Sequence, residues 1–142
     1  MKLSFYLIIT FLTLNCISKK NDTENIKSDK YLEVFYMKEG LRYPMQLNCS
    51  VLHGELLKNK VRYKKIEDIV LLDKFTNEFN KLKTSKEQRD IDVRIQVIYH
   101  NKKAIDTICM GDYFDIQVNG INKDDSKSFL KMIKDETYYK IE

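Results

Sequence analysis

Side chains suited to covalent or acid–base chemistry are scarce in this chain, which has three cysteines and two histidines among 142 residues. Cys49 and His53 are four residues apart, but the alternation of apolar and polar residues over Gln46–Leu52 predicts a strand. Four residues span about 13 Å along a strand, so this spacing does not bring a thiol and an imidazole together. Catalysis would instead need a site assembled from residues that are distant in the sequence, as in a small hydrolase that uses His100 with Cys109 or Asp106.

Metal-binding and cofactor-binding motifs are also missing from the sequence. No pair of cysteines or histidines has zinc-ligand spacing, and the aspartates at 112, 115, 124 and 125 lack the alternating oxygen ligands of a calcium loop. With four glycines and no phosphate-binding loop, the backbone offers no nucleotide cradle. We therefore expect no metal and no cofactor, and we interpret the aspartates as turn and helix-cap residues.

The first residues predict export from the cytoplasm. Met1-Lys2 is followed by an apolar run, Leu3–Leu14, that is broken only by one serine and two threonines. This run of about 12 residues is shorter than the roughly 20 that a helix needs to cross a bilayer, and it is typical of a signal peptide. A buried N-terminal helix is disfavoured because the run has no polar face. We assign residues 1–15 to a signal peptide.

The end of this run, Leu12-Thr13-Leu14-Asn15-Cys16, resembles the lipobox of bacterial lipoproteins. The resemblance covers only about the first 16 residues, and it departs from the usual pattern at Thr13 and Asn15, where leucine and a small residue are common. It implies that Cys16 becomes the first mature residue and carries a lipid, whose acyl chains would anchor the protein to a membrane. We expect the outer membrane or the cell surface rather than the inner membrane. The alternative is a secreted protein in which Cys16 stays a thiol.

Export also changes the expectation for the two remaining cysteines, Cys49 and Cys109. Disulfides persist in oxidising compartments, and a bond between these residues would close a loop of roughly 60 residues. Such a bond would contribute about 4 kcal/mol in the chain-entropy description. The sequence leaves this disulfide and two buried free thiols as equal alternatives, because it gives no Cα separation.

Composition limits the rest of the chain to one small folded domain. Residues 16–30 are polar and lack periodicity, so we interpret them as a flexible tether that leads into a single domain over residues 31–142. The net charge of +4, with 32% charged residues, is only mildly basic. Together with export, this modest charge argues against nucleic acid as a partner.

Alternating apolar and polar residues predict five or six strands. The expected ranges are 32–37, 46–52, 58–64, 90–100, 104–110 and 113–118. The third of these would carry a basic face, which we interpret as a solvated edge, made by Lys58, Lys60, Arg62 and Lys64. The turn at 101–103 makes residues 90–110 a hairpin. The sequence does not fix its register, so Ile95 is expected beside either Ile108 or Cys109.

Two of these strands have a clear apolar side, and two segments have helical periodicity. The inward residues of the strands are expected to be Ile91, Val93, Ile95, Val97 and Tyr99, then Phe114, Ile116 and Val118. One helix would begin near Glu67 or Asp68 and bury Ile69, Leu72, Phe75, Phe79 and Leu82. The other would be capped within Asp124-Asp125-Ser126 and bury Phe129, Leu130, Met132 and Ile133.

These elements define the fold class. Tight turns between neighbouring strands favour an antiparallel sheet, and one apolar face per strand favours helices on a single side. We predict an α+β fold: a two-layer domain with a mainly antiparallel sheet of about five to six strands and two helices on one face. The other face would be a candidate binding face that shows Asp92, Arg94, Gln96, Asp115, Gln117 and Asn119.

The functional expectation follows from the predicted anchor, the single domain and the polar sheet face. We expect a membrane-anchored envelope lipoprotein that acts as a non-enzymatic protein-binding or accessory module. Its partners would be the membrane, through the lipid anchor, and another envelope protein. A small envelope hydrolase with a site assembled from separated residues is the alternative.

Overall fold

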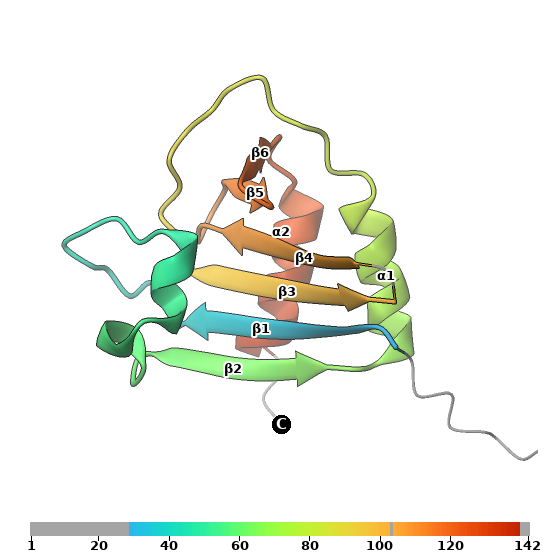
Figure 1. Ribbon diagram of the computed structural model, residues 1–142, viewed down its shortest axis with the longest axis horizontal. Helices are drawn as coiled ribbons and strands as arrows, with labels where there is room; N and C mark the ends of the chain where they lie inside the picture. Colours follow the sequence, from blue (N-terminus) through green and yellow to red (C-terminus); the bar gives the residue numbers. More distant parts are fainter. Residues whose placement is uncertain (1–28, 103, 140–142) are drawn as a thin grey trace, which may run out of the picture.

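The computed structural model describes residues 29–102 and 104–139. Within them, six strands form one antiparallel sheet in the order β2-β1-β3-β4-β5-β6, and two helices, α1 and α2, cover one of its faces (Figure 1). The predicted α+β fold is confirmed. No helix in the described ranges has the length and apolar character needed to cross a bilayer. The expected signal peptide, Cys16 and the tether up to residue 28 lie outside the described residues.

The strands are joined mainly by short connections. Their bounds are Tyr31–Met37 for β1, Val61–Ile66 for β2, Ile95–Asn101 for β3, Ala104–Met110 for β4, Ile116–Val118 for β5 and Ile121–Lys123 for β6. In the β3–β4 hairpin Asn101 pairs with Ala104 and Ile95 pairs with Met110, so both expected registers were wrong. The short connection sets this register, which places Val97 opposite Ile108 on the helix-covered face.

The last strand, β6, was not predicted. It follows the turn at Asn119-Gly120, whose φ angles of 50° and 80° are both in the left-handed region. That is the backbone geometry of a two-residue hairpin turn, for which Asn-Gly is the favoured pair. The turn signal was therefore read correctly, but its second strand is only three residues long and carries no visible alternation.

Side-chain caps start both helices where the sequence predicts. Asp68 precedes α1 (Ile69–Phe79), and its Oδ1 accepts a hydrogen bond from the Leu71 amide at 2.8 Å. Ser126 precedes α2 (Lys127–Lys134), which continues as a π turn over Asp135–Tyr139. Ile69 is exposed rather than buried, because it is the first residue of α1 and precedes the turn that reaches the sheet.

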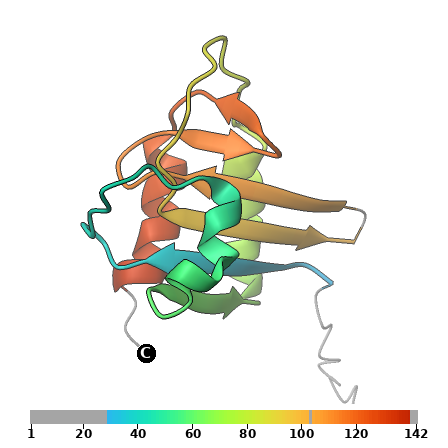
Figure 2. The ribbon, with the colours of Figure 1, turned by 60° about the vertical axis from the view of Figure 1, so that its left-hand side comes forward.

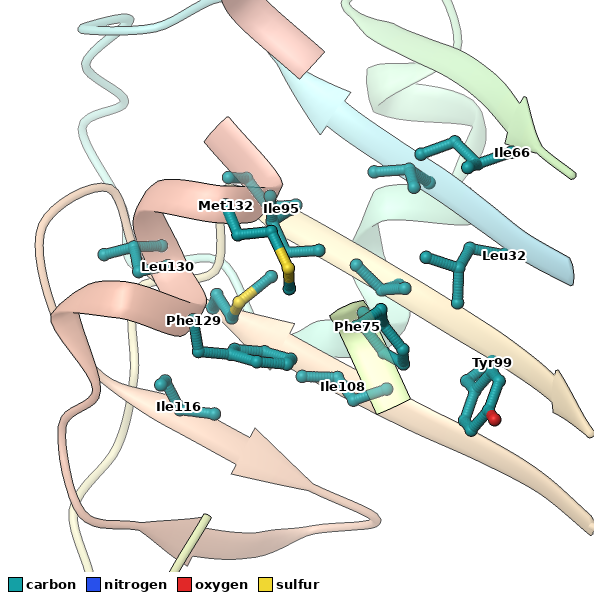
Figure 3. Packing of buried hydrophobic residues seen from close by; sticks show 14 of the residues in the cluster. Leu32, Ile66, Phe75, Ile95, Tyr99, Ile108, Ile116, Phe129, Leu130 and Met132 are labelled. Carbon is teal, nitrogen blue, oxygen red and sulfur yellow. The ribbon is translucent and has the colours of Figure 1, made fainter. Parts of the chain in front are cut away.

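The main core lies between the sheet and the two helices. Phe75 of α1 is fully buried, with its ring centroid 5.0 Å from Tyr99 of β3 and 5.5 Å from Phe129 of α2 (Figure 3). Apolar residues from every strand except β6 complete this cluster. It accounts for the expected burial of Leu72, Phe129, Leu130, Met132 and Ile133.

The opposite face of the sheet carries a second, smaller core. We call residues 38–60 the covering segment; it lies on the face away from α1 and α2 (Figure 2). Its expected strand at 46–52 was wrong, because Cys49–His53 is a 3₁₀ helix, η1, followed by a second, η2, at Glu55–Leu57. Asn48 caps η1 by accepting from the Val51 amide at 3.2 Å, which stabilises a local turn in place of an extended chain.

The segment before β3 packs with this second core and not with the main one. The strand predicted from residue 90 begins only at Ile95, and Ile91 and Val93 contact the covering segment instead of facing the helices. The Val93 amide donates to the Leu47 carbonyl at 2.8 Å. This backbone pairing with a remote loop turns both side chains toward that loop, so the predicted alternation holds only from Ile95 onward.

Two further expectations are corrected by where strands begin. Since β2 starts at Val61, Lys58 and Lys60 lie in the preceding turn and only Arg62 and Lys64 alternate within the strand. The strand is at the edge of the sheet, as expected. Lys64 donates to the Glu136 carbonyl at 3.0 Å. Since β5 starts at Ile116, Phe114 lies in the turn before it and is exposed.

Candidate functional site

The covering segment is joined to the sheet by a disulfide between Cys49 of η1 and Cys109 of β4, whose Cα atoms are 5.8 Å apart. Cys109 is buried, and the Gln96 amide nitrogen donates to the Cys49 carbonyl at 3.3 Å. A disulfide sulfur is not a free nucleophile, so Cys109 cannot serve a hydrolase in this state.

The other members of the alternative hydrolase site are not brought together either. Asp106 accepts from the Asn119 amide nitrogen at 2.8 Å, at the turn end of β5. His100 pairs with Ile105 in the sheet, one position from Asp106, so the two side chains point to opposite faces. The arrangement weighed from the sequence is therefore contradicted.

The predicted polar face is not one continuous exposed surface. Arg94 is 6% exposed and Gln96 5% exposed, because the covering segment lies over them. Gln117 donates to Asn122 at 2.9 Å beside β6. The helices do cover one side only, but sequence reasoning missed that a loop covers much of the other side.

Three of the predicted face residues meet at one end of the sheet. Asp92, Arg94 and Asp115 line a pocket of about 440 Å³, which we call the end pocket. It lies where β1 and β4 end and β3 begins, between the start of the covering segment and the turn that follows β4. The remaining lining residues are Gly40, Leu41, Arg42, Tyr43, Gly111, Asp112, Tyr113 and Phe114.

A fixed ion pair forms the floor of this pocket. Arg94 Nη2 donates to Asp92 Oδ2 at 2.5 Å, while Asp92 Oδ1 accepts from the Leu47 amide at 3.0 Å. The Arg94 guanidinium also lies 5.7 Å from the ring centroid of Tyr43, within cation–π range. The contacts with Asp92 and Tyr43 fix the position of the buried Arg94 guanidinium beside the pocket.

The wall of the pocket is a tight turn over residues 111–115. A side chain at Gly111 would place its Cβ 2.6 Å from the Phe114 carbonyl, and the Gly111 amide donates to the Asp115 carbonyl at 3.1 Å. Asp115 has a φ of 69°, and its carboxylate lies 2.9 Å from Arg89 Nε. Burial raises the pKa of Asp115, although the Arg89 charge opposes this shift. The turn therefore leaves Tyr113 73% exposed and Phe114 56% exposed at the rim.

Lys134 of α2 bonds to both the covering segment and the 111–115 turn. Its Nζ lies 2.5 Å from Glu39 Oε1 and donates to the Asp112 carbonyl at 3.1 Å. The ammonium is also 5.4 Å from the ring centroid of Tyr113. The hydrogen bond from Lys134 lowers the pKa of Glu39, so this ion pair is present at neutral pH. The aromatic rim is thereby held by bonds to a core helix.

A second polar cluster lies at the other end of the sheet. Glu33 accepts from the Tyr63 hydroxyl at 3.0 Å, and its other oxygen is 2.6 Å from His100 Nε2. The imidazole stacks on Tyr31 with ring centroids 4.1 Å apart. Both carboxylate oxygens are thus occupied by neighbouring strands, so this cluster is well placed to fix strand pairing.

The end pocket is suited to non-covalent binding. It combines a buried charge with exposed aromatic side chains on a rigid turn, and such side chains dominate binding energy at protein interfaces. In the described ranges, no group of three or more His, Cys, Asp or Glu side chains is placed to hold a metal ion. The sequence contained one signal for the rim: Tyr113 and Phe114 are adjacent, so in an extended chain they cannot both face the core.

Comparison with known proteins gave no significant match to a family model, to a curated protein or to a solved structure.

Proposed function

We propose that this protein is a membrane-anchored envelope lipoprotein that acts as a non-enzymatic binding module, with the end pocket as its contact site for another envelope protein. The observation that carries the proposal is the pair of exposed aromatic residues, Tyr113 and Phe114, held beside the ion pair of Asp92 with buried Arg94. Rigid aromatic side chains lose little conformational entropy when they bind, so most of their contact energy becomes affinity.

The anchoring part of the proposal rests on the leader and its lipobox-like end at Cys16. The disulfide between Cys49 and Cys109 suits the same interpretation, because such bonds persist in exported proteins and are rare in the cytoplasm. We place the protein in the cell envelope, at the outer membrane or the cell surface.

Mass spectrometry of the mature N-terminus tests the anchor. We expect a protein that begins at a lipid-modified Cys16 and floats with membranes, and a Cys16→Ser variant that is released from them. Native protein that still begins at Met1 and carries no lipid would overturn the anchor.

Photo-crosslinking in intact cells tests the contact site. A crosslinking residue in place of Tyr113 should give one discrete adduct, whereas the matched control in place of Ile121, an exposed residue of β6, should give none. The variant with Tyr113→Ala and Phe114→Ala should lose co-isolation of the crosslinked protein while it keeps its circular dichroism and its disulfide. Equal adducts from both positions, or unchanged co-isolation, would exclude the end pocket as the site.

A further inference from the structure

The end of the sheet opposite the end pocket is where the described chain begins. Leu32 pairs with Ile66, and Tyr31 pairs with His100, which in turn pairs with Ile105. These residues therefore form one row across four strands, seen at the right of Figure 1. We call this row, with residues 67–70 and Lys102, the entry end.

The entry end exposes branched aliphatic side chains. Val70 and Ile69 project from the first turn of α1, and Ile105 projects from β4; all three are exposed. Val70 and Ile69 are neighbours on α1, whereas Ile105 lies on the sheet face away from α1. All three are at the same end of the sheet, where burying exposed apolar side chains would release hydration water. The nearby charges are largely paired with one another, as in Lys65–Glu67 and Lys102–Asp29, so they do not oppose an apolar contact.

The position of the chain entry indicates what covers this surface. About 14 residues, 17–30, separate Cys16 from β1. The tether expected from their composition lies largely outside the described residues. A coil of 14 residues has an end-to-end distance of about 20 Å. A lipid on Cys16 would hold the entry end within about that distance of the bilayer, at an effective concentration in the millimolar range, where weak contacts suffice.

We propose that the entry end of the lipidated protein rests on the bilayer, with Val70, Ile69 and Ile105 inserted among the lipid headgroups. This inference rests on the proposed lipid anchor and extends it from attachment to orientation. The seven residues of β1, Tyr31–Met37, span about 20 Å, so the end pocket then faces away from the membrane. The rim residues Tyr113 and Phe114 are thereby presented to a partner in the envelope.

Tryptophan fluorescence tests this orientation because the chain has no tryptophan of its own. Full-length lipidated protein carrying Val70→Trp, and separately Ile105→Trp, is reconstituted in phosphatidylcholine vesicles with or without brominated acyl chains. The matched control is Leu56→Trp in η2, beside the end-pocket side of the sheet, since Leu56 is 89% exposed and Val70 79% exposed.

We expect brominated lipid to quench the two entry-end reporters at least twofold and to leave the control within about a tenth of its unquenched intensity. No quenching of Val70→Trp and Ile105→Trp in protein that floats with the vesicles would overturn the orientation and leave the anchor standing. A blue-shifted but unquenched reporter would mean that another protein copy covers the surface, which also overturns it. Failure to float, with Cys16 unmodified, would instead count against the proposed anchor.

Discussion

The two faces of the sheet are covered by different means. On one face, α1 and α2 bury periodic apolar side chains and satisfy their own backbone hydrogen bonds. On the other, the covering segment is irregular, so its backbone and its charges need specific partners in the sheet. Asp92 and Val93 supply two of these partners to Leu47, and the disulfide supplies a covalent one. We infer that the first layer depends on packing volume and the second on individual bonds.

The largest effect is expected from a cavity in the helix-covered core. Phe75→Ala should lower the free energy of unfolding by about 3–5 kcal/mol, because it removes a fully buried ring between α1, α2 and β3. Urea denaturation measures this change. The control Ile69→Ala, at the exposed start of the same helix, should stay within about 0.5 kcal/mol of the parent. Similar losses for both variants would contradict the view that packing volume holds this layer.

Removing the disulfide should act mainly on the other face. We expect the variant with Cys49→Ala and Cys109→Ala to lose about 2–4 kcal/mol of unfolding free energy, since the bond closes a loop with a sequence separation of 60. Hydrogen exchange should increase in η1 and little in α1. A uniform increase over both layers would break the distinction between them.

The bond between Asp92 and the covering segment should contribute less. Asp92→Ala removes the acceptor of the Leu47 amide and the partner of buried Arg94, and we expect a loss of about 1–3 kcal/mol in thermal or urea unfolding. Asp92→Asn keeps an acceptor oxygen and should lose less. The exposed neighbour variant Asp90→Ala should be nearly neutral. An equal loss from Asp90→Ala would show that the stability change comes from removing a negative charge and not from the bonds of Asp92.

The smallest effect is expected at the ion pair between Glu39 of the covering segment and Lys134 of α2. The folded-state pKa of Glu39 is lowered, so its contribution is present above the ordinary value of 4.5 and is lost as pH falls through the folded-state pKa. The pair is partly exposed, so Glu39→Gln should cost only a few tenths of a kcal/mol at neutral pH. Unfolding curves of parent and variant should converge well below pH 4.5. If the stability difference between parent and variant grew as pH fell, the pKa of Glu39 would not be lowered in the folded state, which would contradict the prediction.

Local sequence patterns were sufficient for elements whose side chains meet a regular layer. The capped starts of α1 and α2, the hairpin of β3 and β4 and the Asn119-Gly120 turn all follow from spacing and backbone preference within a few residues. These features depend on residues that are close together along the chain, so they can be predicted from the sequence.

Tertiary structure alone decided what covers the second face and hence where the end pocket lies. Gln46–Leu52 alternates like a strand, yet Cys49–His53 is a 3₁₀ helix that is capped at Asn48 and bonded to Cys109 of the sheet. Arg94 and Gln96 are polar, as on a solvated face, yet a remote loop buries them. A periodic pattern shows which side of a chain is apolar, but a polar side can be covered whenever distant residues supply its hydrogen bonds, and those residues are identified only by the fold.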